Sequence, residues 1–587
     1  MAESLLETAR QLDPVINDTI KVAKDSKVWL KLRSALQQKL QMFDTVRLSW
    51  WTHWAELAMY ILPRRYHWLI VANQTNKGFP RNQNIVDATG TIAARTLASG
   101  LMSGLTSPTR PWFKLAIDDP ELMKSAAVKM WLEEVAKRMY TVMARSNFYD
   151  ALATMYFDLV VFGTAVMIIY DDYDTVIRCY NPCAGEYYLG ASAALRIHEM
   201  ARKFTFTISQ SAEMFGVENL SDNDQAVYKA GGAQSQREQV IAHMIEPNLP
   251  ITLDGSEDEE FVVPRKFRWR ETYWVWGGSA ERPLAMRGFT EMPFIAPRWD
   301  VVSNDPYGRS PCMDALPDIM QLQFETRRKA EAIEKIVRPP MIADVSLKNE
   351  PTSITAGGIT YVANLASSGM KPVFEVRPDL KDMREDLMEI QKRIKDILFN
   401  NVLLMISQLE TVRSATEVDA RREEQMLQLG PVIERTQGEG LDIAMERIFG
   451  IMHRKNLFPP APPEIQGKAL QIQYKSMMAQ SQLAASTAAI ERTFQFAGNL
   501  AGVKPDILDN LDADDAIEKY ADFLGAPASI IKDPKFVAQE RNIRAKKQQQ
   551  ADLLNQTLAG AKGAKDLSEA QVGGGINALQ MMTGGAH

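Results

Sequence analysis

Apolar residues recur every three or four positions over two long stretches in the second half of the chain. The first, residues 311–337, begins at a proline and ends before an Arg-Pro-Pro sequence that cannot continue a helix. The second, residues 378–399, opens with Asp379, a good N-cap, behind a proline. We therefore predict two helices. The second carries one apolar seam, formed by Leu380, Met383, Leu387, Ile390, Ile394 and Ile397.

A segment rich in turn-forming glycine and serine separates these helices. Residues 338–377 contain two runs typical of strands, ITYVA and PVFEV. We expect a compact, strand-bearing loop here. The residues expected to shape it are Pro339, Pro340, Ile359, Tyr361, Val373 and Phe374.

An apolar loop follows the second helix. Residues 400–413 include five consecutive apolar side chains, and a helix over residues 414–456 then opens with a capping box. The dipeptide Gly430-Pro431 should kink that helix. The apolar loop either lines a passage or is buried in a helical core. Its residues of interest are Asn401, Val402, Leu403, Leu404, Met405, Ile406 and Gln408.

The rest of the chain predicts an α+β, mainly helical fold. Residues 1–310 combine amphipathic helices with a body of strands between about 164 and 300, where the apolar period shortens to two. Residues 457–555 contain three expected helices, at Ala469–Asn499, Pro505–Leu524 and Pro534–Leu554. Residues 556–587 are rich in glycine, alanine and glutamine, and we expect them to be disordered.

Composition narrows the class of protein without defining it. The 587 residues are 46% hydrophobic and 24% charged, with a net charge of −6, so no basic footprint indicates tight nucleic-acid binding. Three cysteines suggest a reducing compartment and no disulfide framework. We see no signal peptide and no apolar run long enough to cross a membrane, and expect no stable membrane insertion.

The sequence contains no convincing catalytic or metal-binding motif. Asp171, Asp172 and Asp174 resemble a two-metal nuclease cluster, but their position between two short strands favours a solvated hairpin turn. Cys179, Cys183 and His198 lack the spacing of a metal site and suit buried strand positions. Neither a phosphate-binding loop nor a nucleophile elbow is present. We therefore expect no enzyme activity and no cofactor.

The order helix, strand-bearing loop, helix, apolar loop and kinked helix resembles the portal proteins of tailed phages. More narrowly, the chain resembles the head-to-tail connector family of short-tailed phages. Two further stretches carry the likeness: DATGTIAARTLASGLMSGLTSPTRPWFKL at residues 87–115 and ATEVDARREEQMLQLGPVIERTQGEGLDIAMERIFG at residues 415–450.

The resemblance implies a portal fold. Its parts would be a wing (1–310), stem helix 1 (311–337), a clip (338–377), stem helix 2 (378–399), a tunnel loop (400–413), a kinked wing helix (414–456), crown or barrel helices (457–555) and a disordered tail (556–587). It also implies a homo-oligomer, a dodecameric ring at one capsid vertex of the virion, assembled in the host cytoplasm. Double-stranded DNA would pass through without sequence recognition. Expected partners are the terminase large subunit, tail adaptor or nozzle proteins, and the major capsid and scaffolding proteins.

The charged faces of the two stem-like helices allow two interpretations. They could make weak contacts with DNA in a channel, or they could simply be solvated surface. The residues concerned are Arg327, Arg328, Lys329, Lys392, Arg393 and Lys395. The alternative function is a virion structural protein other than a portal, such as a tail, core or ejection component.

Overall fold

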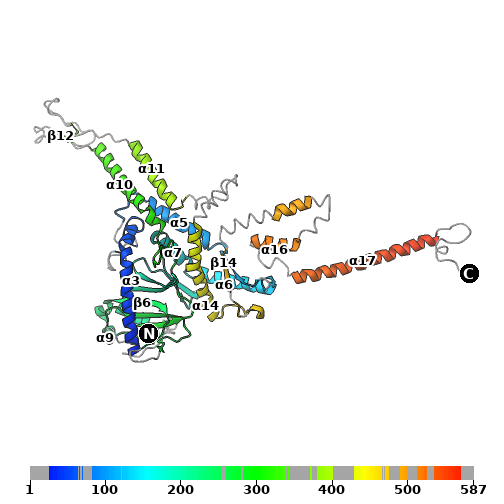
Figure 1. Cartoon of the computed structure of the whole chain (residues 1–587), viewed down its shortest axis with the longest axis horizontal. Helices are drawn as coiled ribbons and strands as arrows, with labels where there is room; N and C mark the ends of the chain where they lie inside the picture. Colours follow the sequence, from blue (N-terminus) through cyan, green and yellow to red (C-terminus); the bar gives the residue numbers. More distant parts are fainter. Residues whose placement is uncertain are drawn as a thin grey trace, which may run out of the picture. The chain divides into compact units, whose positions relative to one another are not determined.

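The computed structural model describes most of the chain (Figure 1). The described residues are 26–63, 65, 69, 82–119, 122–252, 259–278, 282–338, 341–342, 371–372, 380–400, 429–465, 467–468, 470–474, 490–499, 512–524 and 534–569. They fall into two compact units. The first comprises Met1–Phe113, Val135–Pro459 and Tyr474–Met478, and the second comprises Lys114–Glu134, Pro460–Gln473 and Ala479–His587.

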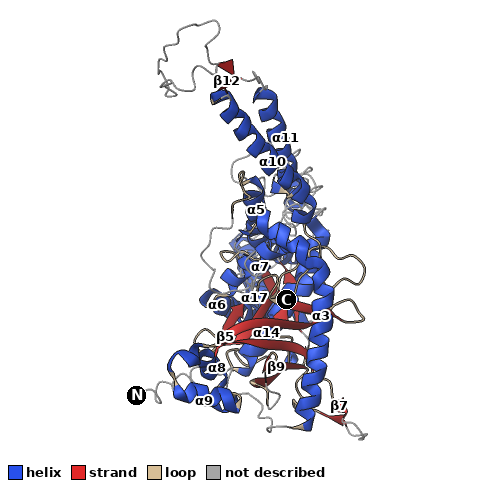
Figure 2. Cartoon of the chain, turned by 90° about the vertical axis from the view of Figure 1, so that its left-hand side faces the viewer, coloured by secondary structure: helices blue, strands red, loops and turns tan. Residues whose placement is uncertain are grey.

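A five-stranded antiparallel sheet forms the centre of the first unit. Its order is β10 (Ala285–Phe289), β9 (Trp269–Val275), β6 (Glu238–Pro247), β5 (Ile197–Thr207) and β4 (Tyr187–Ala191). Successive side chains point to opposite faces, so Met244 and Trp274 face one way and Ile241 and Tyr273 the other. Helix α3 (Lys27–Tyr60) covers the first face with Trp29, Leu32, Leu36 and Leu40. Helix α8 (Ile208–Phe215) covers the second (Figure 2).

A smaller sheet lies beside buried helices in the same unit. Its order is β11 (Phe294–Ile295), β2 (Met167–Asp171) and β3 (Ile177–Tyr180). The apolar helix α7 (Phe148–Phe162) leads into it and packs on α5 (Thr89–Leu105). Helix α14 (Asp442–Arg454) packs on β2 and β11. The expected strand-rich body is therefore present, as two sheets with helices packed on them.

Two long helices, α10 (Pro311–Val337) and α11 (Leu380–Ile397), run side by side and extend away from the sheets at one end of the first unit (Figures 1 and 2). Helix α10 occupies the predicted range. Beyond its end, β12 (Met341–Ile342) pairs antiparallel with β13 (Lys371–Pro372).

The remaining elements are shorter or irregular. They are α6 (Ala126–Arg145), α9 (Asp222–Ala230), the 3-10 turns η2 (Leu122–Lys124), η3 (Val217–Asn219), η4 (Gly232–Gln236) and η7 (Pro463–Ile465), and the paired strands β7 (Ile251–Thr252) and β8 (Glu259–Glu260). The expected kink at Gly430-Pro431 is not an interruption in the described part of that helix, because residues 429–436 are helical. The irregularity lies one to two turns later, in the π-helical turn η6 (Gln437–Leu441).

The second unit corrects three expectations. Strand β14 (Leu470–Tyr474) replaces the start of the predicted helix Ala469–Asn499, because LQIQY alternates apolar and polar residues and pairs with β1 (Phe113–Ile117). Lys114–Glu134, which lie within the expected wing over residues 1–310, are grouped with C-terminal residues in this unit.

The third correction concerns the tail. Helix α17 (Pro534–Glu569) continues through residues 556–569, which were expected to be disordered. Alanine, glutamine and lysine are strong helix formers, and each glycine costs only about 1 kcal/mol in a helix interior. Residues 570–587 lie outside the described part. Another helix of this unit, α16 (Ala513–Leu524), ends where the predicted helix Pro505–Leu524 ends.

Candidate functional site

The candidate site is the pair α10 and α11 together with the residues that anchor it. Helix α10 begins at Ser310, whose Oγ accepts a hydrogen bond from the Met313 backbone N–H at 3.1 Å and donates to the Val161 carbonyl at 2.8 Å. This cap fixes the start of α10 on the end of α7. Within α10, Pro317 removes one intrahelical hydrogen bond close to the body.

The apolar seam of α11 faces α10. Leu387, Ile390 and Ile394 are buried, with Ile390 1% and Ile394 0% exposed. Met383 and Ile397 are half-buried. The side chain of Leu380 lies outside the described residues. The three-four spacing read from the sequence therefore coincides with the buried side of α11 at every seam position whose side chain is described.

Two buried or half-buried amides attach the pair to α5. The Gln323 Oε1 atom of α10 accepts hydrogen bonds from the backbone N–H groups of Val86 (2.7 Å) and Asp87 (2.8 Å), and its Nε2 donates to the Asp87 carbonyl at 2.8 Å. The Gln391 Nε2 atom of α11 donates to Asp87 Oδ2 at 2.7 Å. Helices α10 and α11 thus both form hydrogen bonds with Asp87, just before α5 begins.

Close packing adds to these polar anchors. A Cβ placed on Gly90 of α5 would lie 2.9 Å from Ile319 Cδ1 of α10. The stretch 87–115 therefore contributes the platform on which the helix pair is mounted. The sequence reasoning singled out this stretch but missed Gln323 and Gln391, because a single glutamine on a helix carries no signal of its partner.

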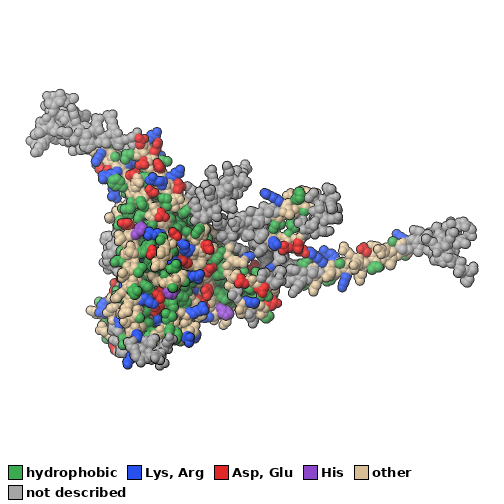
Figure 3. All heavy atoms as spheres, viewed as in Figure 1, with side chains coloured by type: hydrophobic (Ala, Val, Ile, Leu, Met, Phe, Trp, Pro, Cys, Tyr) green, Lys and Arg blue, Asp and Glu red, His purple; other side chains and the backbone are tan. Residues whose placement is uncertain are grey.

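The six candidate channel charges do not form one cluster. Arg327, Arg328, Lys392 and Lys395 are exposed and Lys329 is half-buried. Arg328 pairs with Glu331 at 2.8 Å within α10. Arg393 instead bridges the two helices through Asp318 at 3.2 Å. Side chains of both signs are visible along the pair in Figure 3.

The remaining predicted site residues are those of the tunnel loop and the clip. All seven tunnel-loop residues from Asn401 to Gln408, and all six clip residues from Pro339 to Phe374, lie outside the described residues. Their assigned roles stay predictions. The paired strands β12 and β13 are the part of the expected strand-bearing loop that the structure describes.

Two buried arginines form a network of ion pairs that joins residues 429–454 to the small sheet and the segment just after it, and the sequence did not indicate this network. Arg298 pairs with Glu439 of η6 at 2.6 Å, and Arg447 of α14 pairs with Asp171 at 2.7 Å and Glu291 at 3.0 Å. Burial alone would raise the pKa of Glu291, but hydrogen bonds and charge from Arg454 and Arg447 lower it below its usual range. These contacts hold that helical segment firmly against the body.

The acidic trio near residue 172 is a hairpin turn, as expected. Asp171 belongs to the Arg447 pair, and Asp172 accepts hydrogen bonds from the Thr175 backbone N–H (2.8 Å) and Oγ1 (2.7 Å). Cys179, Cys183 and Cys312 are free and buried. Within the described residues no cluster of histidine, cysteine, aspartate and glutamate could hold a metal ion.

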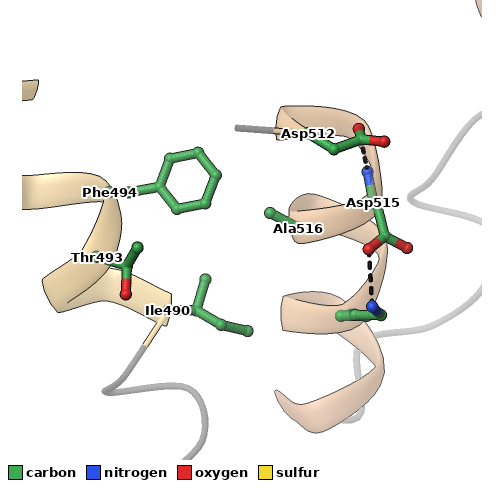
Figure 4. A pocket seen from close by; sticks show the side chains of 7 residues that line it. Ile490, Thr493, Phe494, Asp512, Asp515 and Ala516 are labelled. Atoms are coloured by element: carbon green, nitrogen blue, oxygen red, sulfur yellow. Dashed lines mark hydrogen bonds and ion pairs between the residues drawn. The ribbon is translucent and has the colours of Figure 1, made fainter. Parts of the chain in front are cut away.

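One open pocket of about 330 Å³ lies in the second unit, between residues 490–499 and α16 (Figure 4). Its acids are engaged by their own helix: Asp512 Oδ1 accepts from the backbone N–H groups of Asp514 (3.1 Å) and Asp515 (3.0 Å), and Asp515 pairs with Lys519 at 2.7 Å. The pocket is a packing groove between two helices. Among the described helices, none is both long and apolar enough to cross a membrane.

Comparison with known proteins gives a consistent answer. Residues 33–531 match the family described as bacteriophage head to tail connecting protein. The "Probable portal protein" of Bordetella phage BPP-1 is 38% identical over 544 residues, covering 92% of this chain and 96% of that protein. The "Portal protein" of Salmonella phage epsilon15 is 37% identical over 542 residues, with the same coverage.

A solved structure adds little to this. A chain in the "Virion of native gene transfer agent (GTA) particle" is 11% identical, with a TM-score of 0.32, and covers 73% of this chain and 99% of that one. Such a likeness is too low to bear on the fold.

The sequence relatives define a class, the structural proteins that connect head and tail in a virus particle. The chain belongs to the family of bacteriophage head to tail connecting proteins, and it is a phage portal protein.

Proposed function

We propose that this portal protein assembles as a dodecameric ring at one vertex of the capsid. The ring is the channel through which double-stranded DNA enters during packaging and leaves during infection. The observation that carries the proposal is the α10–α11 pair on a body whose family is that of head to tail connectors. In this role neither helix has to recognise a particular DNA sequence.

The dimensions of the pair suit this role. The 27 residues of α10 make a helix of about 40 Å, and the 18 residues of α11 one of about 27 Å. One turn of B-DNA is about 34 Å long. A ring of such pairs would form a collar about one duplex turn deep. In this assignment α10 and α11 are the two stem helices, residues 338–377 the clip and residues 400–413 the tunnel loop.

The proposal extends to partners. The clip docks the terminase large subunit during packaging and a tail adaptor or nozzle protein afterwards. The body contacts the major capsid and scaffolding proteins. The protein acts in the virion after assembly in the host cytoplasm. It performs no catalysis of its own.

Electron microscopy of the purified full chain, with native mass spectrometry beside it, tests the ring. We expect rings with a central channel and a mass near twelve times the 66.0 kDa of one chain. A small closed oligomer without a channel would overturn the proposal.

Deletion of residues 402–406 tests the tunnel loop separately. We expect rings to form normally and DNA retention in packaging assays to fall. Loss of ring assembly in this variant would mean that the segment is core and does not line the channel.

A further inference from the structure

The exposed surface of α11 is divided into two flanks of opposite charge. Basic residues recur every three or four positions on one side of the apolar seam, and acidic residues do so on the other. The basic flank consists of Lys381, Arg384, Lys392 and Lys395, with Met388 between them. The acidic flank consists of Asp382, Asp386, Glu389 and Asp396, with Arg393 between them.

Helix geometry places these flanks on the two sides of the pair. At about 100° per residue, Arg384 and Lys395 lie roughly 90–110° from the centre of the seam. Asp386 and Glu389 lie roughly 70–130° from it in the other direction. Because the seam faces α10, the flanks face sideways, where a neighbouring molecule could approach.

The one cation on the acidic flank does not neutralise it. Arg393 pairs with Asp318 of α10 at 3.2 Å, so its charge is already matched within the pair. Arg384, Lys395, Asp386 and Glu389 are all exposed, and none of them forms an ion pair with another described residue. Lys381 pairs with Glu385 within α11 at 3.9 Å, so the charge available to a neighbour is argued from Arg384 and Lys395 on the basic flank and from Asp386 and Glu389 on the acidic flank.

We propose that, in the ring inferred above, the basic flank of α11 in one copy packs against the acidic flank of α11 in the next copy. This inference rests on the proposed ring. In a cyclic assembly two different surfaces of the chain meet at every interface, so they must complement each other. Flanks of one sign would repel at each contact, whereas opposite flanks attract and set the order of the copies.

A second copy of the chain would complement the charge of both flanks, whereas DNA would complement only the basic flank. Phosphates would attract the basic flank but be repelled by the acidic flank on the same helix. An oppositely charged pair of flanks is also compatible with a ring, because each copy then contacts its two neighbours through the same two different surfaces. The occupant of this surface is therefore another copy of this chain.

Charge reversal in the full chain tests the contact. One variant carries Arg384→Glu and Lys395→Glu, a second carries Asp386→Lys and Glu389→Lys, and a third carries all four substitutions. At about 0.05 M salt we expect each double variant to form at least about tenfold fewer rings than the wild type, and the fourfold variant to regain them. At about 1 M salt, where the Debye length is about 3 Å, the defect of the double variants should largely disappear.

Mixing provides a control for folding. At the four substituted positions the first double variant is acidic on both flanks and the second is basic on both. We therefore expect neither to assemble alone and an equimolar mixture to form rings of alternating copies. Two outcomes would overturn this contact and leave the proposed ring intact. In the first, the wild type forms rings and the double variants form them equally well. In the second, the fourfold variant and the mixture both fail to assemble. A wild-type chain that forms no ring would overturn the proposed function instead.

Discussion

Two glycines meet where the small sheet, α7 and the start of α10 come together. Gly163 has φ +73°, and a Cβ on it would lie 2.3 Å from the Gly308 carbonyl oxygen. A Cβ on Gly308 would lie 2.4 Å from the Gly163 oxygen. Backbone is in contact with backbone here, so no side chain can move to make room.

Gly163→Ala should therefore destabilise the first unit by about 2–5 kcal/mol, combining backbone strain with overpacking. Urea unfolding followed by tryptophan fluorescence measures this. Gly104→Ala is the matched control: Gly104 is helical and has nothing within 4 Å of its Cβ position, so the change should be neutral or stabilising by up to about 1 kcal/mol. Equal effects at the two glycines would contradict the close contact.

A fully buried histidine links the stability of the large sheet to pH. Arg202 Nε donates to His243 Nδ1 at 2.9 Å, so the ring proton is on Nε2, which lies 2.8 Å from Glu271 Oε1. Burial is the main reason why the pKa of His243 falls to about 4, against attraction from Glu271. The neutral ring is favoured in the folded state. The stability it contributes is present above pH 6.5 and is lost as the pH falls towards 4.

Between pH 7.5 and pH 5 this loss should amount to about 2 kcal/mol. Burial raises the pKa of Asp158 to about 6 despite its pair with Arg65, so that carboxyl gains stability as the pH falls and acts in the opposite direction. Comparing wild type with His243→Gln isolates the histidine, because Asp158 titrates in both. We expect the wild type to lose about 2 kcal/mol more than the variant over this range. The same pH slope in both proteins would refute the assignment.

The stability of helix α11 depends more on the burial of its apolar seam than on the helix propensity of its residues. It carries many charges, and its burial is concentrated at Leu387, Ile390 and Ile394. Ile394→Ala removes a fully buried side chain and should cost about 2–5 kcal/mol. Hydrogen exchange followed by mass spectrometry should then show at least about tenfold faster exchange over residues 380–397.

Met388→Ala is the control on the same helix. Met388 is 56% exposed, so its loss should change stability by less than about 0.5 kcal/mol. If both variants exchange alike, the seam does not hold the pair together.

The long amphipathic helices could be predicted closely, because a local signal determines each end. Pro311 and the Arg-Pro-Pro sequence bound α10 at the predicted residues. Strand β14 was missed, because its two-residue alternation is short and lies among helix-forming residues. Whether such a run becomes a strand depends on β1, more than 350 residues earlier in the chain.

The candidate site was only partly predictable for a similar reason. The seam is a property of one helix, so its spacing identifies it. The anchoring contacts are not a property of one helix. Gln323 and Asp87 are 236 residues apart in the sequence, and Arg298 and Glu439 are 141 residues apart. No local pattern links such partners, because tertiary packing brings them together. The π-helical turn that places Glu439 also gave no signal beyond its two glycines.

The division into two units has a consequence for assembly. The described cores on both faces of the large sheet use residues between Trp29 and Met286, and the helix pair is anchored on α5. All of these residues belong to the first unit. Removing everything after Met478 should therefore leave the first unit folded and, if the ring is held through the helix pair, still able to form rings.

A chain ending at residue 468 is the sharper comparison, because it also lacks β14. Tyr474 of β14 donates to Asp442 Oδ1 at 2.5 Å and stacks on Trp112 with ring centroids 6.2 Å apart. Without this strand β1 loses its only partner in the described part of the chain, and an exposed strand edge favours aggregation. We expect rings of chain 1–478 in electron microscopy with a melting temperature close to that of the full chain, and aggregation of chain 1–468. If chain 1–478 folds but forms no rings, residues 479–587 hold the copies together, and the contact between helix pairs is not sufficient for assembly.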